Sequence, residues 1–225
     1  MPPPDNLFCK VYEWSIEPTQ SSMTTSVAVE KRRIYKSGFR FLRTDRQSAF
    51  CPPSANAQLI GWHILSPVDV LLSPINEVQF QASEEEAKAI ASQAGFNYLW
   101  QRDGVYIGVT TAIPLRLFDY KTSEGSEAMF ILNGEGTLEW RLGFQVLPPV
   151  GCGVLILDDP SFPKDLCIPG FMSYENLLSL NSKGGLSIAI KPTRSASIKR
   201  GDIIARLLLM PSDTVDLNMS ARFKR

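Results

Sequence analysis

The sequence predicts a single, mainly β domain. Apolar and polar residues alternate with a period of two along most of the chain, which is typical of half-buried strands. Turn signals such as Asp103-Gly104 and Asn133-Gly134 separate these segments, roughly every 8–12 residues. The chain has 225 residues, of which 44% are hydrophobic and 20% charged, so it can bury a core without disulfides or metals.

The first part of the chain supplies short strands. These predicted strands are residues 7–14, 39–43, 61–66, 68–72 and 77–81. Aromatic and β-branched residues dominate the first of them, as strands favour. Pro67 divides the third from the fourth, because proline cannot donate a hydrogen bond to a sheet ladder.

One helix is predicted, over residues 83–94. Ser83 followed by Glu86 three residues later is the capping-box pattern, and Gly95 is a natural helix end. The acidic first turn suits the positive end of the helix dipole, and we prefer this interpretation to a metal-binding cluster.

Strands and tight turns return after the helix. The predicted strands are residues 98–101, 105–111, 129–132, 137–142, 144–147, 154–157, 176–180, 186–190 and 203–210. This many short strands indicates a barrel or sandwich rather than a nucleotide-binding α/β sheet. We expect one domain over 1–225, with an N-terminal β-rich extension of about 1–95 packed on a barrel of about 96–211 and a tail over 212–225.

Several common chemistries are excluded by the sequence. Lysine plus arginine and aspartate plus glutamate both number 23, so no global charge points to nucleic acid or an anionic membrane. Phosphate-loop, dinucleotide-binding and nucleophile-elbow motifs are absent. His63 is the one histidine, and its apolar strand predicts a satisfied, half-buried side chain rather than a catalytic one. We predict no metal site.

A basic stretch over residues 31–46 leaves a nucleic-acid alternative open. Aromatic side chains alternate there with basic ones, a combination that suits single-stranded nucleic acid. The residues that would contact it are Lys31, Arg32, Arg33, Arg40 and Arg43. A solvated strand face is the preferred interpretation, because the net charge of the chain is zero.

The N-terminus has no signal-peptide pattern, and no apolar run is long enough to span a membrane. The four cysteines are widely spaced, so we predict reduced and mostly buried thiols in a protein that is not secreted.

The C-terminal half resembles a known fold family. Leu147-Pro-Pro-Val-Gly151 and Gly201-Asp-Ile-Ile-Ala-Arg206 are similar to the strand turn and late strand of the dUTPase-like β-clip barrel. Cys51-Pro52, Gly61-Trp-His-Ile64 and Pro67-Val-Asp69 resemble an extension found in an uncharacterised family of phage and bacterial proteins. The resemblance implies a β-clip barrel and a homo-oligomer such as a trimer. Together with the reduced cysteines and the absence of a signal-peptide pattern, it leads us to expect a cytoplasmic or virion-associated protein.

The catalytic elements of that barrel are not matched. Ser173 stands where a dUTPase has its catalytic aspartate, and Asp158-Asp-Pro-Ser161 replaces the expected Arg-Ser motif. Lys164, Tyr174 and Glu175 are the candidate ligand contacts. If the chain is an enzyme, the candidate catalytic residues are Asp158, Asp159 and Asp165, which would bind Mg²⁺ through oxygen ligands.

Three functions remain open. The preferred one is a non-catalytic binding or structural protein, related to phage proteins, that acts through protein–protein contacts and needs no cofactor. The first alternative is a Mg²⁺-dependent enzyme acting on a nucleotide or a related small molecule. The second alternative is a nucleic-acid-binding module that uses residues 31–46.

Overall fold

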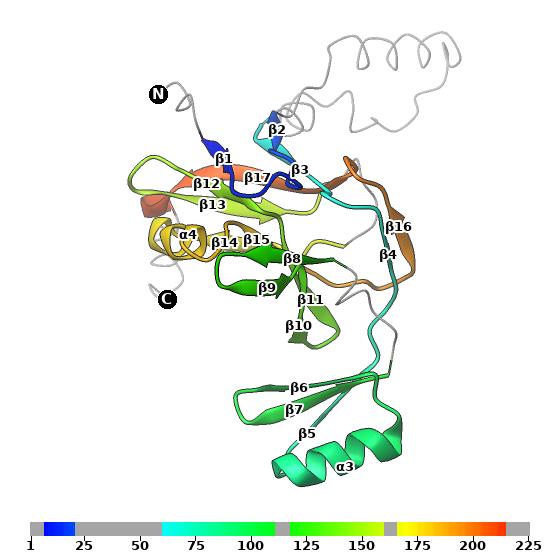
Figure 1. Cartoon of the computed structure of the whole chain (residues 1–225). Coiled ribbons are helices and arrows are strands. Elements are labelled where there is room, and N and C mark those ends of the chain that lie inside the picture. The colour runs from blue at the N-terminus through cyan, green and yellow to red at the C-terminus, as the bar shows by residue number, and fades with distance from the viewer. Residues whose placement is uncertain (1–6, 21–59, 111–117, 160–165, 215–225) are drawn as a thin grey trace, which may run out of the picture.

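The structure, a computed structural model, describes residues 7–20, 60–110, 118–159 and 166–214. This part of the chain is mainly β, as the alternation predicts, and its strands form open antiparallel sheets (Figure 1). The predicted strand over residues 39–43 lies outside the described residues, and so does Cys51.

The largest sheet has five strands in the order β14-β13-β17-β3-β2. Their bounds are Thr19–Gln20 (β2), Trp62–Leu65 (β3), Cys152–Leu157 (β13), Gly170–Met172 (β14) and Ile203–Pro211 (β17). β17 is the central strand, and its apolar sequence buries Ile204, Ala205 and Leu207. Because β3 pairs with β17, a strand of the predicted N-terminal extension is part of the same sheet as the C-terminal half.

A second sheet of three strands supplies the largest buried side chains. Its order is β10 (Phe130–Gly134), β11 (Thr137–Arg141) and β15 (Ser187–Ile190). The rings of Phe130 and Trp140 lie 4.9 Å apart, and both side chains are fully buried. They share one hydrophobic core with Val154 and Leu207 of the five-stranded sheet. The two sheets therefore stabilise each other by burying common apolar surface.

Three pairs of strands surround these sheets. They are β1 (Phe8–Lys10) with β12 (Phe144–Val146), β4 (Val70–Leu72) with β16 (Ala196–Ile198), and β8 (Asp119–Thr122) with β9 (Gly125–Ala128). β1 is shorter than predicted, because the N–H groups of Val11 and Tyr12 both donate to the carbonyl of Gly143 and the chain then turns. The β8–β9 hairpin was not predicted, since it lacks an apolar alternation.

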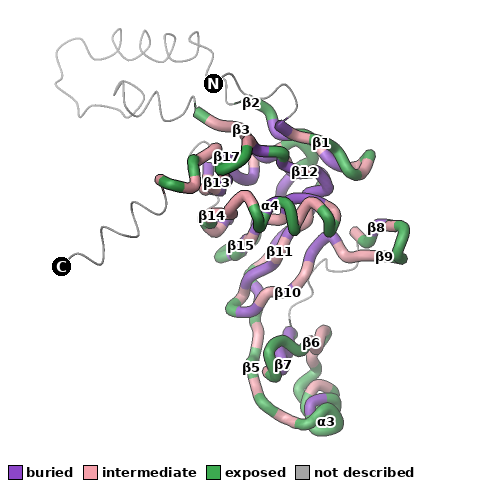
Figure 2. The backbone as a smooth tube through the Cα atoms, turned by 90° about the vertical axis from the view of Figure 1, so that its left-hand side faces the viewer, coloured by how far each residue is buried: buried purple, intermediate pink, exposed green. Residues whose placement is uncertain are grey.

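Residues 77–109 form a small unit, here called the module, that projects from the rest of the described chain (Figures 1 and 2). It contains β5 (Glu77–Phe80), α3 (Glu84–Ala94), β6 (Tyr98–Arg102) and β7 (Val105–Val109), with strand order β5-β7-β6.

The two faces of the module sheet differ. On the face with Phe80 and Tyr106, the Phe96 ring lies directly over Gly108, where a Cβ atom would collide with it. Alternation places Ile107 and Val109 on the opposite face, where both are buried in the main core. The inner face therefore anchors the module to the second sheet and its neighbours.

Helix α3 confirms the predicted capping box. The N–H of Glu86 donates to the Ser83 hydroxyl (3.4 Å), while the Glu86 carboxylate accepts from the N–H of Ser83 (3.0 Å). Gly95 ends the helix in the left-handed conformation, with φ of +67°.

A second helix, α4 (Tyr174–Asn181), corrects the strand predicted over residues 176–180. Ser173 is its N-cap, and its hydroxyl accepts from the N–H of Asn176. The error arose because a short apolar run does not separate a strand from a helix by periodicity alone. Only Leu177 of this helix is buried, and it belongs to the main core.

The turn over residues 199–202 is held by its own side chains. The Asp202 carboxylate accepts from the N–H of Lys199 (2.9 Å), and the Arg200 guanidinium donates to the carbonyls of Trp14 (2.8 Å) and Pro67. The N–H of Arg200 donates to Asp69 (2.6 Å). These contacts join three segments that are distant in the sequence and direct the chain into β17.

The cysteines are less buried than predicted. Cys167 is buried, but Cys152 is half-buried and Cys9 is exposed, and all three are free thiols. Burial raises the pKa of the Cys167 thiol to about 12, with a smaller contribution from Asp158, so this thiol stays protonated. None of the helices in the described part of the chain is long and apolar enough to cross a membrane.

Candidate functional site

Asp159 lies in a buried charged cluster at one end of the five-stranded sheet. It follows β13 by two residues, and the sheet register places Leu157 opposite Arg206 and Arg206 opposite His63. The Asp159 carboxylate is fully buried, and its Oδ2 accepts from Nε (3.1 Å) and lies 3.0 Å from Nη2 of Arg206. Nε2 of His63 is 3.3 Å from the same oxygen. Strand pairing therefore brings these three residues together from three separate segments.

The electrostatics of this cluster favour a structural role. Burial lowers the pKa of His63, and this effect exceeds the opposing attraction of Asp159, while Arg206 adds to the lowering. His63 is therefore neutral at neutral pH, and the charge of Asp159 is balanced by Arg206. The prediction of a satisfied, partly buried histidine is consistent with this position.

The predicted acidic site is only partly within the described residues. Asp158 is half-buried beside Cys167, whereas Asp159 faces Arg206 and His63, and Asp165 lies outside the described residues. In the described ranges, no group of three or more histidine, cysteine, aspartate or glutamate side chains is placed to hold a metal ion. An Asp159 carboxylate already engaged by a guanidinium is a poor Mg²⁺ ligand.

The predicted ligand contacts belong to the start of α4. Glu175 is exposed, and its pKa is lowered first by a hydrogen bond to a backbone N–H and then by the Ser173 hydroxyl. Tyr174 is half-buried in the same turn. These contacts are those of an ordinary capped helix start. Lys164 lies outside the described residues, as do the basic residues of the stretch 31–46.

A groove between the module and the second sheet was missed by the sequence reasoning. We call it the seam groove; it has a volume of about 560 Å³, and the tips of two hairpins face each other across it. Arg102 of β6 donates to the backbone and side-chain oxygens of Asn133 on the opposite hairpin. Gln79, Glu135 and Thr137 also line it. This volume is within the range of small-molecule sites.

The sequence does indicate the two hairpin turns that form the seam groove. Asp103 and Glu135 have positive φ values of 50° and 54°, and each stands beside a glycine in a tight hairpin tip. Sequence patterns predicted both turns but could not show that they meet, because the meeting depends on how the module packs on the core.

Comparison of the chain with profiles of protein families, with characterised proteins and with solved structures gave no significant match.

Proposed function

We propose that this chain is a non-catalytic binding or structural protein that acts through contacts with other protein chains. The proposal includes the dUTPase-like β-clip barrel, a place in a phage-related assembly, and a homo-oligomer such as a trimer. The sequence resemblance supports the barrel, and the order of the Pro148–Gly151 turn, the 199–202 turn and β17 is compatible with it.

The projecting module carries this proposal. Helix α3 buries only Ala87, so it covers the outer face of the module sheet incompletely. Val78 remains 52% exposed and Ile90 37% exposed, and Phe80, Phe96 and Leu99 of the same module are half-buried. Apolar side chains grouped on a projecting unit are typical of a surface that another protein covers.

The buried cluster of Asp159, Arg206 and His63 also supports a non-catalytic function. Of the candidate catalytic carboxylates that the structure describes, Asp159 is the fully buried one, and Arg206 neutralises its charge. A general base must be able to reach a substrate proton, and a carboxylate held in an ion pair beneath the surface cannot do so without rearrangement.

Light scattering of the full chain tests the proposal. We expect the wild-type protein to be a multimer at micromolar concentration, and Val78→Asp and Ile90→Asp to lower its mass. Leu71→Asp is the matched control, because Leu71 is 66% exposed on β4, outside the module. A monomeric wild-type protein, or a multimer that both module variants leave intact, would contradict the use of this surface for self-association.

A thermal-shift screen tests the enzymatic alternative on the same protein. A ligand present at about a hundredfold excess over its Kd stabilises a protein by about 2.7 kcal/mol. We expect no shift with dUTP or other nucleotides in the presence of Mg²⁺. A clear shift that is lost in Asp158→Asn would favour the Mg²⁺-dependent enzyme instead.

A further inference from the structure

A cleft on a different part of the molecule has the chemistry of a small-molecule site. We call it the polar cleft; it has a volume of about 390 Å³. Tyr12, Ser123, Glu124, Glu127, Arg141 and Lys183 line it together with neighbouring turn residues. They come from the N-terminal segment, the β8–β9 hairpin, β11 and the turn after α4, so four segments distant in the sequence converge here.

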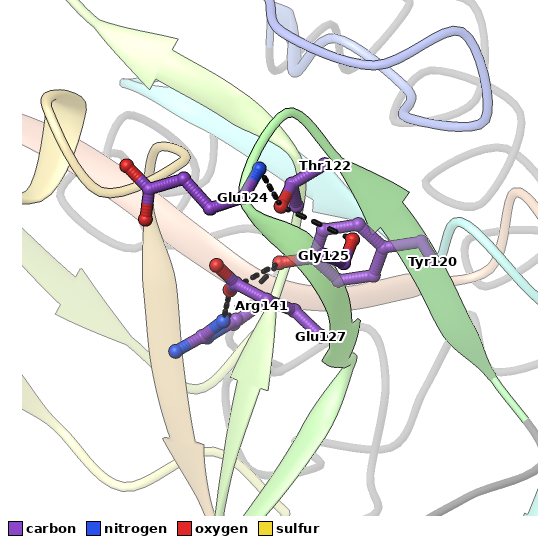
Figure 3. A network of polar contacts seen from close by, with 6 residues as sticks. All are labelled: Tyr120, Thr122, Glu124, Gly125, Glu127 and Arg141. Carbon is purple, nitrogen blue, oxygen red and sulfur yellow. Dashed lines mark hydrogen bonds and ion pairs between the residues drawn. The ribbon is translucent and has the colours of Figure 1, made fainter.

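The position of Arg141 is fixed by its neighbours. Its guanidinium forms an ion pair with Oε2 of Glu127, and one of its nitrogens lies 3.4 Å from the Tyr120 hydroxyl. That hydroxyl in turn donates to Glu127 (3.4 Å), which closes a network of three side chains (Figure 3). Because the side chain of Arg141 is 27% exposed and that of Glu127 is 35% exposed, the network is pre-organised rather than a loose surface pair.

Glu124 is presented to the same cleft by a tight turn. Its N–H donates to the Thr122 hydroxyl (3.2 Å), and that hydroxyl donates to the carbonyl of Gly125 (3.3 Å). In Figure 3 the Glu124 carboxylate points away from this turn, to the same side as the free end of the Arg141 guanidinium. Acceptor and donor groups therefore line one cavity.

Tyr12, which lines the polar cleft, belongs to a cluster of three aromatic side chains. Tyr12 stacks on Trp14 with ring centroids 5.4 Å apart and planes 6° apart, and Tyr120 contacts both rings. Trp14 itself lies against Gly143, where an added Cβ atom would be 2.5 Å from the indole. These ring contacts hold the Tyr12 side chain in place where it lines the cleft.

The charged side chains that line the polar cleft favour a neutral ligand over a strongly charged one. Two carboxylates face two cationic side chains, and Glu127 already neutralises Arg141. A strongly anionic or cationic ligand would therefore meet a group of its own sign. A neutral ring with several hydroxyl groups meets no such repulsion, because each hydroxyl can donate to Glu124 and accept from Arg141 or Lys183.

We propose that the polar cleft binds a neutral saccharide of one or two rings, with an apolar ring face against Tyr12 and the hydroxyl groups on Glu124, Arg141 and Lys183. This site is separate from the module surface of the proposed function, and its occupancy does not depend on protein–protein contacts.

Amide chemical-shift perturbation in the full-length protein tests the proposal. The probes are glucose, galactose, mannose, N-acetylglucosamine and their disaccharides at about 10 mM, tenfold above a millimolar Kd. Inorganic phosphate and free lysine serve as charged comparators. We expect at least one neutral saccharide to shift amides of residues 122–125 and 182–185. No perturbation by any neutral saccharide, or perturbation by the charged comparators alone, would overturn the proposal.

Variants of two exposed residues that line the polar cleft test whether the saccharide binds there. Glu124→Gln and Lys183→Met should each raise the Kd about tenfold or more, since each removes hydrogen bonds to a charged group. Lys121→Met and Glu85→Gln are matched controls, because both residues are exposed and neither lines the cleft. Unchanged affinity in both cleft variants would place the saccharide elsewhere and overturn the assignment.

Discussion

The effect of Asp159 on the stability of the fold depends on whether its charge is paired. A buried ion pair adds little stability over an apolar replacement of similar volume, but removing one partner leaves an uncompensated charge. We therefore expect Arg206→Met to lower the free energy of unfolding by about 3–5 kcal/mol. Urea denaturation measures this change. The double variant Arg206→Met/Asp159→Asn should recover part of the loss, and a loss as large as that of the single variant would contradict the pairing argument.

His63 should make stability depend on pH. Its pKa in the folded chain is below its ordinary value of 6.5, so the unfolded chain takes up the proton first as the pH falls. The contribution of His63 is therefore fully present above the ordinary pKa, and is lost as the pH falls toward the folded-state value. The difference in unfolding free energy between wild type and His63→Asn should shrink between about pH 8 and pH 5.5. A difference independent of pH would contradict the lowered pKa.

Helix α3 depends on its cap because little else holds it. It buries one side chain, and its ion pair between Glu84 and Lys88 is exposed, so packing contributes little to its stability. Ser83→Ala should cost about 1 kcal/mol, measured by urea denaturation or as a loss of helical circular dichroism. Ser92→Ala in the same helix is the control and should not destabilise it, since Ser92 is exposed and alanine is the better helix former. Equal effects of the two variants would argue against the cap.

The elements that were predictable are those with a complete local signal. Ser83, Glu86 and Gly95 mark both ends of α3, and the strands on either side of Pro67 were predicted as two pieces and are β3 and β4. α4 was predicted as a strand because its cap, Ser173, is followed by no Glu or Gln at the third helical position. The polar sequence of β8–β9 carries no hydrophobic period at all.

The sites were harder to predict than the elements, for a related reason. Asp159, Arg206 and His63 each stand in an unremarkable local sequence, and only the register of three strands brings them together. The polar cleft likewise combines Tyr12 with Lys183 through tertiary packing. Short-range patterns report on local conformation and carry no information on which distant segments meet.

The whole molecule combines a well-packed core with a lightly attached module. The five-stranded and three-stranded sheets supply six of the twelve largest fully buried side chains, whereas the module contributes Ile107 and Val109 to the core through its inner face. Among the described residues, its outer face is covered by α3, which buries only Ala87, and by the Phe96 ring. Segments with few buried apolar contacts open with a smaller free energy than the global unfolding reaction.

Native-state hydrogen exchange should resolve these two levels of stability. In the Val78→Asp variant, in which the module surface should be uncovered, we expect the amides of α3 to exchange by local opening, with a free energy well below that of the amides of β13 and β17, which should exchange only by global unfolding. Within the module, the β7 amides should be better protected than those of α3, because Ile107 and Val109 anchor β7 in the core. In the wild-type protein, the multimer proposed through Val78 and Ile90 covers this surface, so the α3 amides should exchange more slowly than in Val78→Asp. Equal exchange of the α3 amides in the wild-type protein and in Val78→Asp would mean that no partner covers α3.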